Sequence, residues 1–179
     1  MYKAIFFDRD GVVNVPIVKK GKQRPPWSKE EVLINKDFVN LKNYYSNNFK
    51  IFIITNQPDY KRGLVSKKQL IDINLEIMQK ISPDDYQIEF SDDPKFKKPS
   101  PYMLLKLSEK HNIDPKNSWM IGDRWSDIKA GENAGCKTIL ILNKFSFTKN
   151  KDGDFVKINP DYTVKTLNEI YEIIKWKKF

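Results

Sequence analysis

Short runs of apolar residues alternate with longer amphipathic segments along this chain of 179 residues. The apolar runs occupy residues 4–7, 51–54, 119–121 and 138–142, and they are apolar at nearly every position. Strands covered on both faces have this pattern, whereas strands with one face in water alternate apolar and polar residues. Because such strands alternate with helical segments, the pattern predicts βα units around a mainly parallel sheet.

Polar residues that commonly cap helices precede four amphipathic segments. Two of them are followed three residues later by Gln69 or Glu169, which completes the pattern of a capping box. Pro101 suits the first turn of a helix and Gly135 suits the position just after one. The four predicted caps are Ser66, Ser100, Ser126 and Thr166.

Two polar stretches, 15–34 and 143–160, interrupt the alternation, and neither is long enough for a second globular domain. A long loop next to a strand end often contributes to binding. We therefore predict a single domain over residues 1–179, with 15–34 as a loop on the substrate side. Residues 143–160 are predicted to form an irregular loop before the last helix.

The formal charge is +9, but the basic residues are 28 lysines and only four arginines. The lysines are scattered along the chain as on a solvated surface, which argues against a nucleic-acid partner. The sequence has no apolar run of about 18 residues and no secretory signal, so we expect a cytoplasmic protein without a membrane segment. Its single cysteine excludes an intrachain disulfide. Nothing in the sequence indicates an oligomeric state.

Two aspartates directly follow the first predicted strand, in the segment Asp8-Arg9-Asp10-Gly11. A buried carboxylate needs partners, and ligands of open α/β sheets bind at the carboxyl ends of the strands. One interpretation is that Asp8 and Asp10 share a hard cation through oxygen ligands. The alternative is that both are turn residues that end the strand.

Polar residues also follow the second and third predicted strands. Thr55 and Asn56 can hydrogen-bond to phosphate oxygens, although both are ordinary turn residues. Asp123 follows the third strand, and Asp127 falls in the first turn of the next helix, where a carboxylate can also act as a cap. Lys98 precedes another helix, and it either neutralises a phosphate or lies on the surface.

Together these segments resemble the four motifs of the haloacid dehalogenase-like (HAD) phosphatase superfamily, in the same order. The resemblance covers about residues 3–142. The most similar group, subfamily IIIA, contains the histidinol-phosphate and D,D-heptose bisphosphate phosphatases, whose signatures include DRDG-x-x-N and TNQ followed by Arg-Gly. The resemblance implies a Rossmann-like, three-layer α/β fold without a large cap domain. The motifs read DRDGVVN at 8–14, ITNQ at 54–57, KKP at 97–99 and GDRWSD at 122–127.

The resemblance assigns the chemistry to the first and fourth motifs. Asp8 is the nucleophile that forms an aspartyl-phosphate, and Asp10 is the general acid and base. Mg²⁺ is held by Asp8, by the backbone carbonyl of Asp10 and by Asp123.

The remaining motif residues are expected to bind the phosphoryl group. The resemblance assigns its oxygens to Thr55, Asn56 and Lys98, with Asp127 orienting Lys98 or a metal-bound water. Long polar side chains near the motifs are candidates for the rest of the substrate, although a tryptophan among them can equally pack within its own loop. These candidates are Arg24, Trp27, Arg62, Lys97 and Arg124.

One departure concerns zinc. Many members of the subfamily carry a zinc loop of cysteine and histidine before the Lys-Pro motif, but residues 90–99 here read FSDDPKFKKP. We therefore expect no structural zinc. The arginine usual in the group before Lys-Pro is replaced by Lys97, so the substrates of the group do not transfer directly.

The sequence thus predicts a Mg²⁺-dependent phosphomonoester hydrolase for a small phosphorylated metabolite, such as a heptose bisphosphate. One alternative is a polynucleotide 3′-phosphatase, because that family also has a TNQ-like second motif and this chain is basic. Another is a non-catalytic phosphate-binding protein, although such a protein is expected to have damaged motifs.

Overall fold

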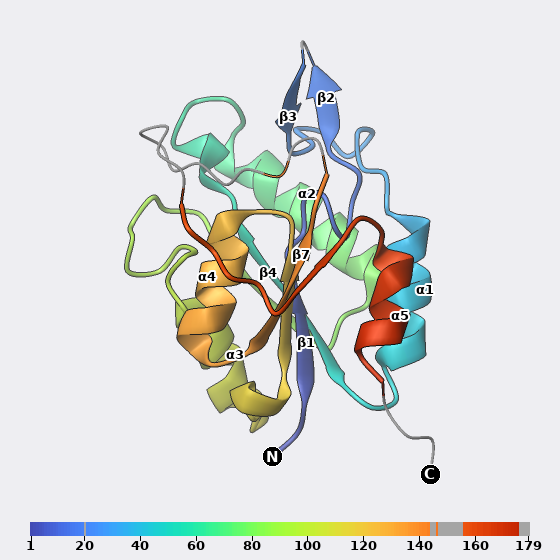
Figure 1. Ribbon diagram of the computed structural model, residues 1–179. Helices are drawn as coiled ribbons and strands as arrows, with labels where there is room; N and C mark the ends of the chain where they lie inside the picture. The colour runs from blue at the N-terminus through green and yellow to red at the C-terminus, as the bar shows by residue number, and fades with distance from the viewer. Residues whose placement is uncertain (20, 144–145, 147–155, 176–179) are drawn as a thin grey trace.

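The computed structural model describes residues 1–19, 21–143, 146 and 156–175 (Figure 1). Within this part of the chain, a six-stranded sheet has the order β5-β4-β1-β6-β7-β8, and every neighbouring pair is parallel. The strands are β1 (Ala4–Phe7), β4 (Lys50–Asn56), β5 (Asp85–Glu89), β6 (Trp119–Gly122), β7 (Lys137–Ile141) and β8 (Tyr162–Val164).

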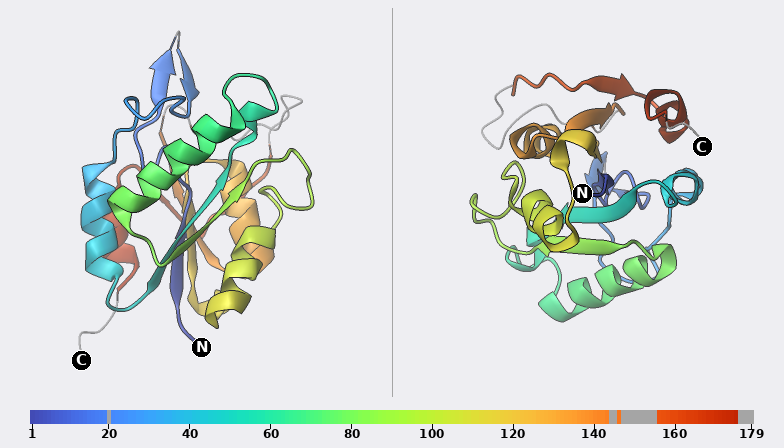
Figure 2. Two further views of the ribbon diagram at one scale, coloured as in Figure 1. Left: turned by 180° about the vertical axis from the view of Figure 1, so that it is seen from behind. Right: turned by 90° about the horizontal axis from the view of Figure 1, so that it is seen from below.

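Helices cover both faces of the sheet, which gives three layers (Figure 2). On one face lie α1 (Lys36–Tyr45), α2 (Lys67–Ile81) and the short α5 (Ile170–Ile173), and their apolar side chains pack on alternate strand residues such as Phe7 and Ile53. On the other face, α3 (Tyr102–His111) and α4 (Trp125–Ala134) pack on the intervening residues. The fold is thus the predicted Rossmann-like α/β fold, without a large cap domain.

All four predicted strands are present as β1, β4, β6 and β7, and β1 is fully buried along its length. The outermost strands, β5 and β8, were not predicted. Strand β5 is only half-buried at every position, and β8 exposes two of its three residues. Edge strands of this kind lack the continuous apolar run that marks a central strand.

Two of the predicted helix starts are confirmed and two are wrong. Ser66 caps α2 through a capping box with Gln69, and Thr166 forms the same box before a 3₁₀ turn (Leu167–Glu169) that leads into α5. Helix α4 begins before Ser126, because Asp127 accepts a hydrogen bond from the backbone N–H of Arg124 at 3.0 Å.

The second error is a shift of one residue. Pro101, rather than Ser100, is the N-cap of α3, and the Ser100 hydroxyl accepts a weak hydrogen bond from the N–H of Tyr102 at 3.3 Å. The predicted end of α4 is confirmed, since Gly135 adopts a left-handed conformation with φ of 81°. Glycine adopts this conformation without the steric cost of a Cβ atom.

Residues 15–34, expected to be a loop, contain an antiparallel hairpin of β2 (Ile17–Lys19) and β3 (Lys22–Arg24). Figure 1 shows this hairpin standing at the carboxyl end of the central strands. Of the expected loop at 143–160, residues 143, 146 and 156–160 have no helix or strand, and the rest lies outside the described residues. Among the described helices, none combines the length and apolar composition needed to cross a membrane.

Candidate active site

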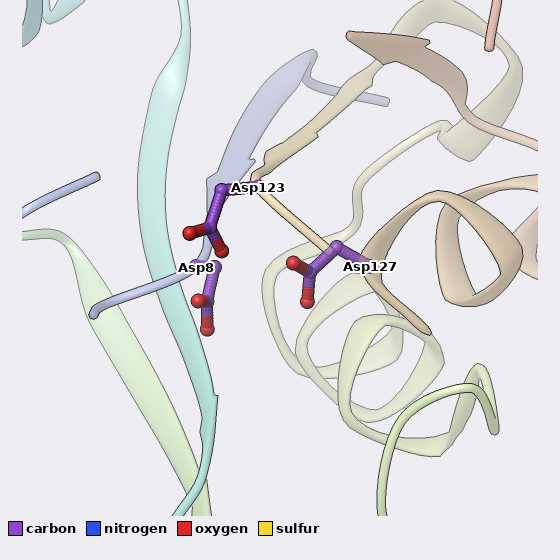
Figure 3. Close-up of side chains that lie close together, drawn as sticks. All are labelled: Asp8, Asp123 and Asp127. Carbon is purple, nitrogen blue, oxygen red and sulfur yellow. The ribbon is translucent and has the colours of Figure 1, made fainter. Parts of the chain in front are cut away.

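Three carboxylates from distant parts of the chain meet at the carboxyl edge of the sheet. Asp8 follows β1 and Asp123 follows β6, and these two strands pair in parallel, so both aspartates emerge at the same edge. Asp127 reaches the same point from the first turn of α4. One oxygen from each carboxylate lies within 4.8 Å of the others (Figure 3). Strand pairing therefore creates the cluster.

Asp123 has buried oxygens without hydrogen-bond donors. The residue is fully buried, and neither carboxylate oxygen accepts a hydrogen bond from any residue that the structure describes. The Nε atom of Arg124 lies 3.9 Å from one of these oxygens, which is too far for a hydrogen bond. Burial, together with the nearby charge of Asp8, raises the pKa of Asp123 to about 8. A divalent cation bound here would remove this unfavourable burial of charge.

Lys98 is the cation of the cluster. Its Nζ atom lies 2.6 Å from Oδ1 of Asp8 and 2.6 Å from Oδ1 of Asp127, and it donates a 3.2 Å hydrogen bond to the carbonyl of Ile54. Burial by itself lowers the pKa of an amine, but Asp127 and Asp8 outweigh it and raise the pKa of Lys98. Burial raises the pKa of Asp8 to about 6 against the opposing effect of Lys98. Lys98 is thus held in its charged form beside Asp8.

Two glycines let the backbone approach this cluster. Gly11 has φ of 94°, and a Cβ atom there would lie 2.5 Å from Oδ2 of Asp123. A Cβ atom on Gly122 would lie 2.3 Å from the Cβ atom of Asp127. Contacts this short are not possible, so both positions require glycine for steric reasons as long as the two carboxylates stay in place.

Asp10 faces a different set of partners from Asp8. The buried guanidinium of Arg9 donates to both of its oxygens, at 2.7 and 2.8 Å, while Asn14 donates at 3.1 Å and Gln57 at 2.7 Å. Burial by itself raises the pKa of a carboxyl, but Arg9 and the two amides outweigh it and lower the pKa of Asp10. The side chain of Asp10 is not part of the three-carboxylate cluster. Any contribution of Asp10 to the metal site thus falls to its backbone carbonyl.

Arg9 is itself positioned by a helix. Its Nη1 atom donates a 2.5 Å hydrogen bond to Oδ1 of Asn74 in α2, and the amide of Asn74 donates to the carbonyl of Leu70 at 2.7 Å. Arg9 is completely buried and Asn74 is 1% exposed. The conformation of Asp10 is therefore fixed from α2 through a buried arginine.

The side chains of Thr55 and Asn56, at the end of β4, have different hydrogen-bond partners. Thr55 accepts a hydrogen bond from Gln57 at 2.9 Å, which leaves its own hydroxyl proton available to a ligand. The amide of Asn56 instead binds the backbone of Lys98, donating to its carbonyl and accepting from its N–H, both at 3.1 Å. Asn56 was expected to hold a phosphoryl oxygen, but its carbonyl oxygen and an amide hydrogen serve to position Lys98.

A cleft of about 950 Å³ opens beside the cluster. Its floor includes Asp8, Asp10 and Lys98, and its walls come from the hairpin, the segment after β4 and the start of α4. Every side chain predicted to contact the rest of the substrate lines this cleft: Arg24, Trp27, Arg62, Lys97 and Arg124. Strand ends that are distant in sequence thus share one cavity with these polar side chains.

Most of the wall residues are already engaged with one another. The guanidinium of Arg24 forms a bidentate pair with Glu31, at 2.5 and 2.8 Å, and stacks 4.2 Å from the centre of the Trp27 ring. The indole N–H of Trp27 donates a 3.0 Å hydrogen bond to the buried carboxylate of Asp59, which also pairs with Arg62 at 3.3 Å. These contacts tie the hairpin loop to the segment that follows β4.

Lys97 also has a partner, because its ammonium lies 2.8 Å from Oδ1 of Asp92. Several residues of the site were not singled out from the sequence. Arg9 stands inside a recognised motif, so its motif position was a usable signal. Asn74, Asp59 and Gln23 carried no signal, since a polar residue on a helix or in a loop is ordinary.

Comparison with known proteins agrees with this geometry. Residues 95–170 match the HAD-hydrolase-like family model. The chain is 31% identical to a D-glycero-α-D-manno-heptose-1,7-bisphosphate 7-phosphatase of Photorhabdus laumondii, over 93% of this chain and 97% of the relative. It is 29% identical to the enzyme of the same name from Campylobacter jejuni, over 98% of this chain and 97% of the relative.

Solved structures share the fold. The D,D-heptose 1,7-bisphosphate phosphatase of B. bronchiseptica, complexed with magnesium and phosphate, superimposes with a TM-score of 0.74 at 20% identity, over 96% of this chain and 97% of that one. The corresponding enzyme of Burkholderia thailandensis has a TM-score of 0.60 at 19% identity, over 97% and 99% of the two chains. Motif order, fold and full-length similarity therefore agree, and we conclude that this chain belongs to the HAD superfamily, as one of its phosphatases.

Proposed function

We propose that this phosphatase hydrolyses a phosphomonoester of a small sugar, with a sugar bisphosphate as the preferred substrate class, through a Mg²⁺-dependent aspartyl-phosphate mechanism. The observation that carries the proposal is the position of Asp8, which lies between the buried ammonium of Lys98 and the unsatisfied carboxylate of Asp123. A carboxylate in such a place has both a charge partner for an incoming phosphate and a neighbour able to share a cation.

The residues present suit a magnesium ion. Mg²⁺ prefers hard oxygen ligands, and the cluster offers carboxylate oxygens from Asp8, Asp123 and Asp127. Because Lys98 already pairs with Asp127, we assign the ion to Asp8 and Asp123, to which the family resemblance adds the backbone carbonyl of Asp10. The buried oxygens of Asp123, without hydrogen bonds among the described residues, are the clearest support for this ligand set. When bound, the ion reduces the repulsion between Asp8 and a phosphate dianion. The expectation that zinc is absent stays a prediction.

The chain's own groups account for the first step. At pH 7 and above Asp8 is largely ionised, given its pKa of about 6, and one of its oxygens forms a bond to phosphorus as the bond between phosphorus and the sugar oxygen breaks. We assign the phosphoryl oxygens to two hydrogen-bond donors, the ammonium of Lys98, which contacts Asp8, and the hydroxyl of Thr55. Preorganised donors of this kind stabilise charge that develops in the transition state.

Asp10 is assigned the proton transfers. Its protonated form gives a proton to the departing sugar oxygen, and the ionised form left behind takes one from the water that hydrolyses the aspartyl-phosphate. The contacts of Asp10 with Arg9, Asn14 and Gln57 lower its pKa and favour the ionised form, so Asp10 has to take up the first proton from solvent or from the substrate's phosphate group before the sugar oxygen departs.

The substrate class rests on two further observations. The relatives from P. laumondii and C. jejuni are named as heptose-1,7-bisphosphate 7-phosphatases, and their similarity covers 93% and 98% of this chain. The cleft of about 950 Å³ is far larger than a phosphate group, and Arg124 and Lys97 line it beyond the acidic cluster. A sugar with a second phosphate fits a space that is roomy and partly cationic.

The test is a panel of phosphate esters assayed for phosphate release in the presence of Mg²⁺ and after its removal with EDTA. We expect the α and β anomers of D-glycero-D-manno-heptose 1,7-bisphosphate to have the highest kcat/KM of the sugar phosphates. We expect Asp8→Asn to reduce kcat by more than about 10³-fold while leaving the circular dichroism spectrum unchanged.

Two outcomes would contradict the proposal in different ways. If an oligonucleotide with a 3′-phosphate is hydrolysed faster than every sugar phosphate, the substrate class is wrong and the polynucleotide phosphatase replaces it. If no ester is hydrolysed with Mg²⁺, or if Asp8→Asn remains active, the catalytic assignment itself fails.

A further inference from the structure

Several side chains in the cleft belong to no recognised motif, and Gln23 is one of them. Gln23 lies in β3, where it pairs with Val18 of β2, and its side chain lines the cleft. A Cβ atom placed on Gly11 would lie 3.4 Å from Nε2 of Gln23 and 2.5 Å from Oδ2 of Asp123. The hairpin therefore brings the amide of Gln23 to the same side of Gly11 as the metal-site carboxylate.

The amide of Gln23 has no hydrogen-bond partner among the residues that the structure describes. Both Nε2 and Oε1 are buried, and neither forms a hydrogen bond with any residue that the structure describes. Leaving a buried polar group unpaired is unfavourable, and buried amides in folded proteins are normally satisfied. Since both atoms lack a partner, this conclusion does not depend on which way round the amide nitrogen and oxygen are placed. An amide in this state at the wall of an active-site cleft indicates a ligand that completes its hydrogen bonds.

The hairpin that carries Gln23 is anchored to the rest of the protein. The next residue, Arg24, forms a bidentate ion pair with Glu31 and stacks on Trp27. Trp27 in turn donates a hydrogen bond to Asp59, which follows β4. Asp59 is 6% exposed, so this anchor lies inside the protein rather than at its surface. Gln23 is consequently held in position over the cleft.

The hydrogen-bonding capacity of the amide limits what can bind there. An amide offers donors from its nitrogen and an acceptor at its oxygen. A phosphate oxygen can only accept and would leave Oε1 unpaired, while an ammonium group can only donate. A hydroxyl group both donates and accepts, so one hydroxyl or two adjacent ones can satisfy the whole amide.

We propose that Gln23 is a specificity-determining residue that binds a hydroxyl group of the substrate close to the phosphate that is removed. This inference rests on the proposed function and deepens it, because it explains how the site distinguishes a polyhydroxylated phosphate ester from a simple alkyl or aryl phosphate. The Gln23 amide donates and accepts the hydrogen bonds to this hydroxyl, and the β2–β3 hairpin places the amide in the cleft.

The experiment compares two dianionic monoesters that differ only in hydroxyl groups, glycerol 3-phosphate and n-propyl phosphate. Their dissociation constants are measured by calorimetry in Mg²⁺ buffer with the full chain carrying Asp8→Asn, so that the esters are not hydrolysed during the titration, and every protein in this experiment carries that change. A single hydrogen bond to a neutral group corresponds to about a three- to tenfold change in affinity. We expect the Asp8→Asn protein to bind glycerol 3-phosphate about three- to tenfold more tightly than n-propyl phosphate.

Gln23→Met keeps the length of the side chain and removes both polar atoms, so we expect the two affinities to come within about twofold of each other. The matched control is Val18→Thr, because Val18 is the exposed cross-strand partner of Gln23 and tests perturbation of the hairpin alone. This control is expected to retain the preference for glycerol 3-phosphate.

The inference is overturned if the Asp8→Asn protein, whose circular dichroism spectrum shows that it is folded, binds the two esters equally. It is equally overturned if Gln23→Met retains the preference, or if Val18→Thr loses it as completely as Gln23→Met does. Failure of the proposed function is seen separately, in the loss or absence of Asp8-dependent phosphate release, because this experiment measures binding and not turnover.

Discussion

The ammonium group of Lys98 lies 2.6 Å from Oδ1 of Asp127, and both side chains are almost completely buried, at 3% and 1% exposure. The other oxygen of Asp127 accepts the N–H of Arg124 and so caps α4. Asp127 therefore links the start of a helix to the lysine that stands beside Asp8. The same contacts that stabilise the fold also fix the charge pattern of the site.

Replacing Lys98 with methionine should be strongly destabilising. The change leaves the carboxylates of Asp8 and Asp127 buried without their cation, and loss of one partner of a buried ion pair costs about 3–5 kcal/mol. We expect this loss in the free energy of unfolding of the metal-free protein, measured by urea denaturation at pH 7. The control is Lys97→Met, which removes a more exposed pair with Asp92 and should cost no more than about 1 kcal/mol. Equal losses in the two variants would contradict the buried ion pair.

The metal-free protein should lose stability as the pH rises. Burial raises the pKa of Asp8 to about 6 and that of Asp123 to about 8, from the ordinary value of 3.8 for an aspartate. The folded state therefore binds more protons than the unfolded state between about pH 4 and pH 8, so the free energy of unfolding decreases with rising pH across that window. The measurement is the Tm in EDTA at pH 5, 6.5 and 8.

Magnesium should reverse this trend, because it binds the ionised carboxylates and stabilises only the folded state. We expect the increase in Tm on adding Mg²⁺ to be larger at pH 8 than at pH 5. Asp123→Asn, which cannot ionise, is the control and should show a smaller dependence of Tm on pH in EDTA. A magnesium effect that is the same at both pH values would contradict the proposed ligand set.

A methyl group at Gly11 should damage both stability and activity. Alanine there would have a positive φ and would also collide with the carboxylate of Asp123, so we expect a loss of more than about 2 kcal/mol and a large decrease in kcat. Gly63 has φ of 71° but nothing within 4 Å of the added Cβ atom, so Gly63→Ala measures the conformational cost alone, about 1–2 kcal/mol. If the two variants unfold at the same denaturant concentration, the close approach to Asp123 is wrong.

The hydrogen bond between Trp27 and Asp59 should be measurable as a coupling energy. In a double-mutant cycle with Trp27→Phe and Asp59→Ala, we expect about 1 kcal/mol or more in the free energy of unfolding. The comparison cycle pairs Trp27→Phe with Lys110→Ala, whose exposed side chain pairs with Asp85 rather than with Asp59, and it should be close to additive. Additivity in the first cycle would show that Asp59 does not hold the hairpin loop.

The central part of the fold could be predicted because its physical cause is local. Residues 4–7 and 119–121 are apolar and lie between turn residues, and burial on both faces follows from that pattern. The convergence of Asp8 and Asp123 could be anticipated in the same way, since parallel neighbouring strands end at one edge of a sheet. The edge strand at 85–89 could not be predicted from the sequence, because its residues are half-buried and mostly polar.

Other parts of the site depend on tertiary placement alone. Asn74 is one polar residue on an amphipathic helix, and only the packing of α2 brings it to Arg9. Gln23 stands in a polar stretch that resembles a loop, and its importance arises from a hairpin that folds over the strand ends. The hydrogen bonds between Asn56 and the backbone of Lys98 were likewise not predictable from the motif, and the assignment of Asn56 to the phosphate stays a prediction.

The all-parallel sheet divides the site between the two halves of the sequence. Asp8 and Thr55 belong to the amino-terminal half, whereas Lys98 and Asp123 belong to the carboxy-terminal half, and β1 joins them by pairing with both β4 and β6. Neither half carries a complete set of groups, so two separately expressed fragments should each be inert and should recover turnover only when they associate. Recovery of activity during refolding would therefore show that β1 has paired with both β4 and β6.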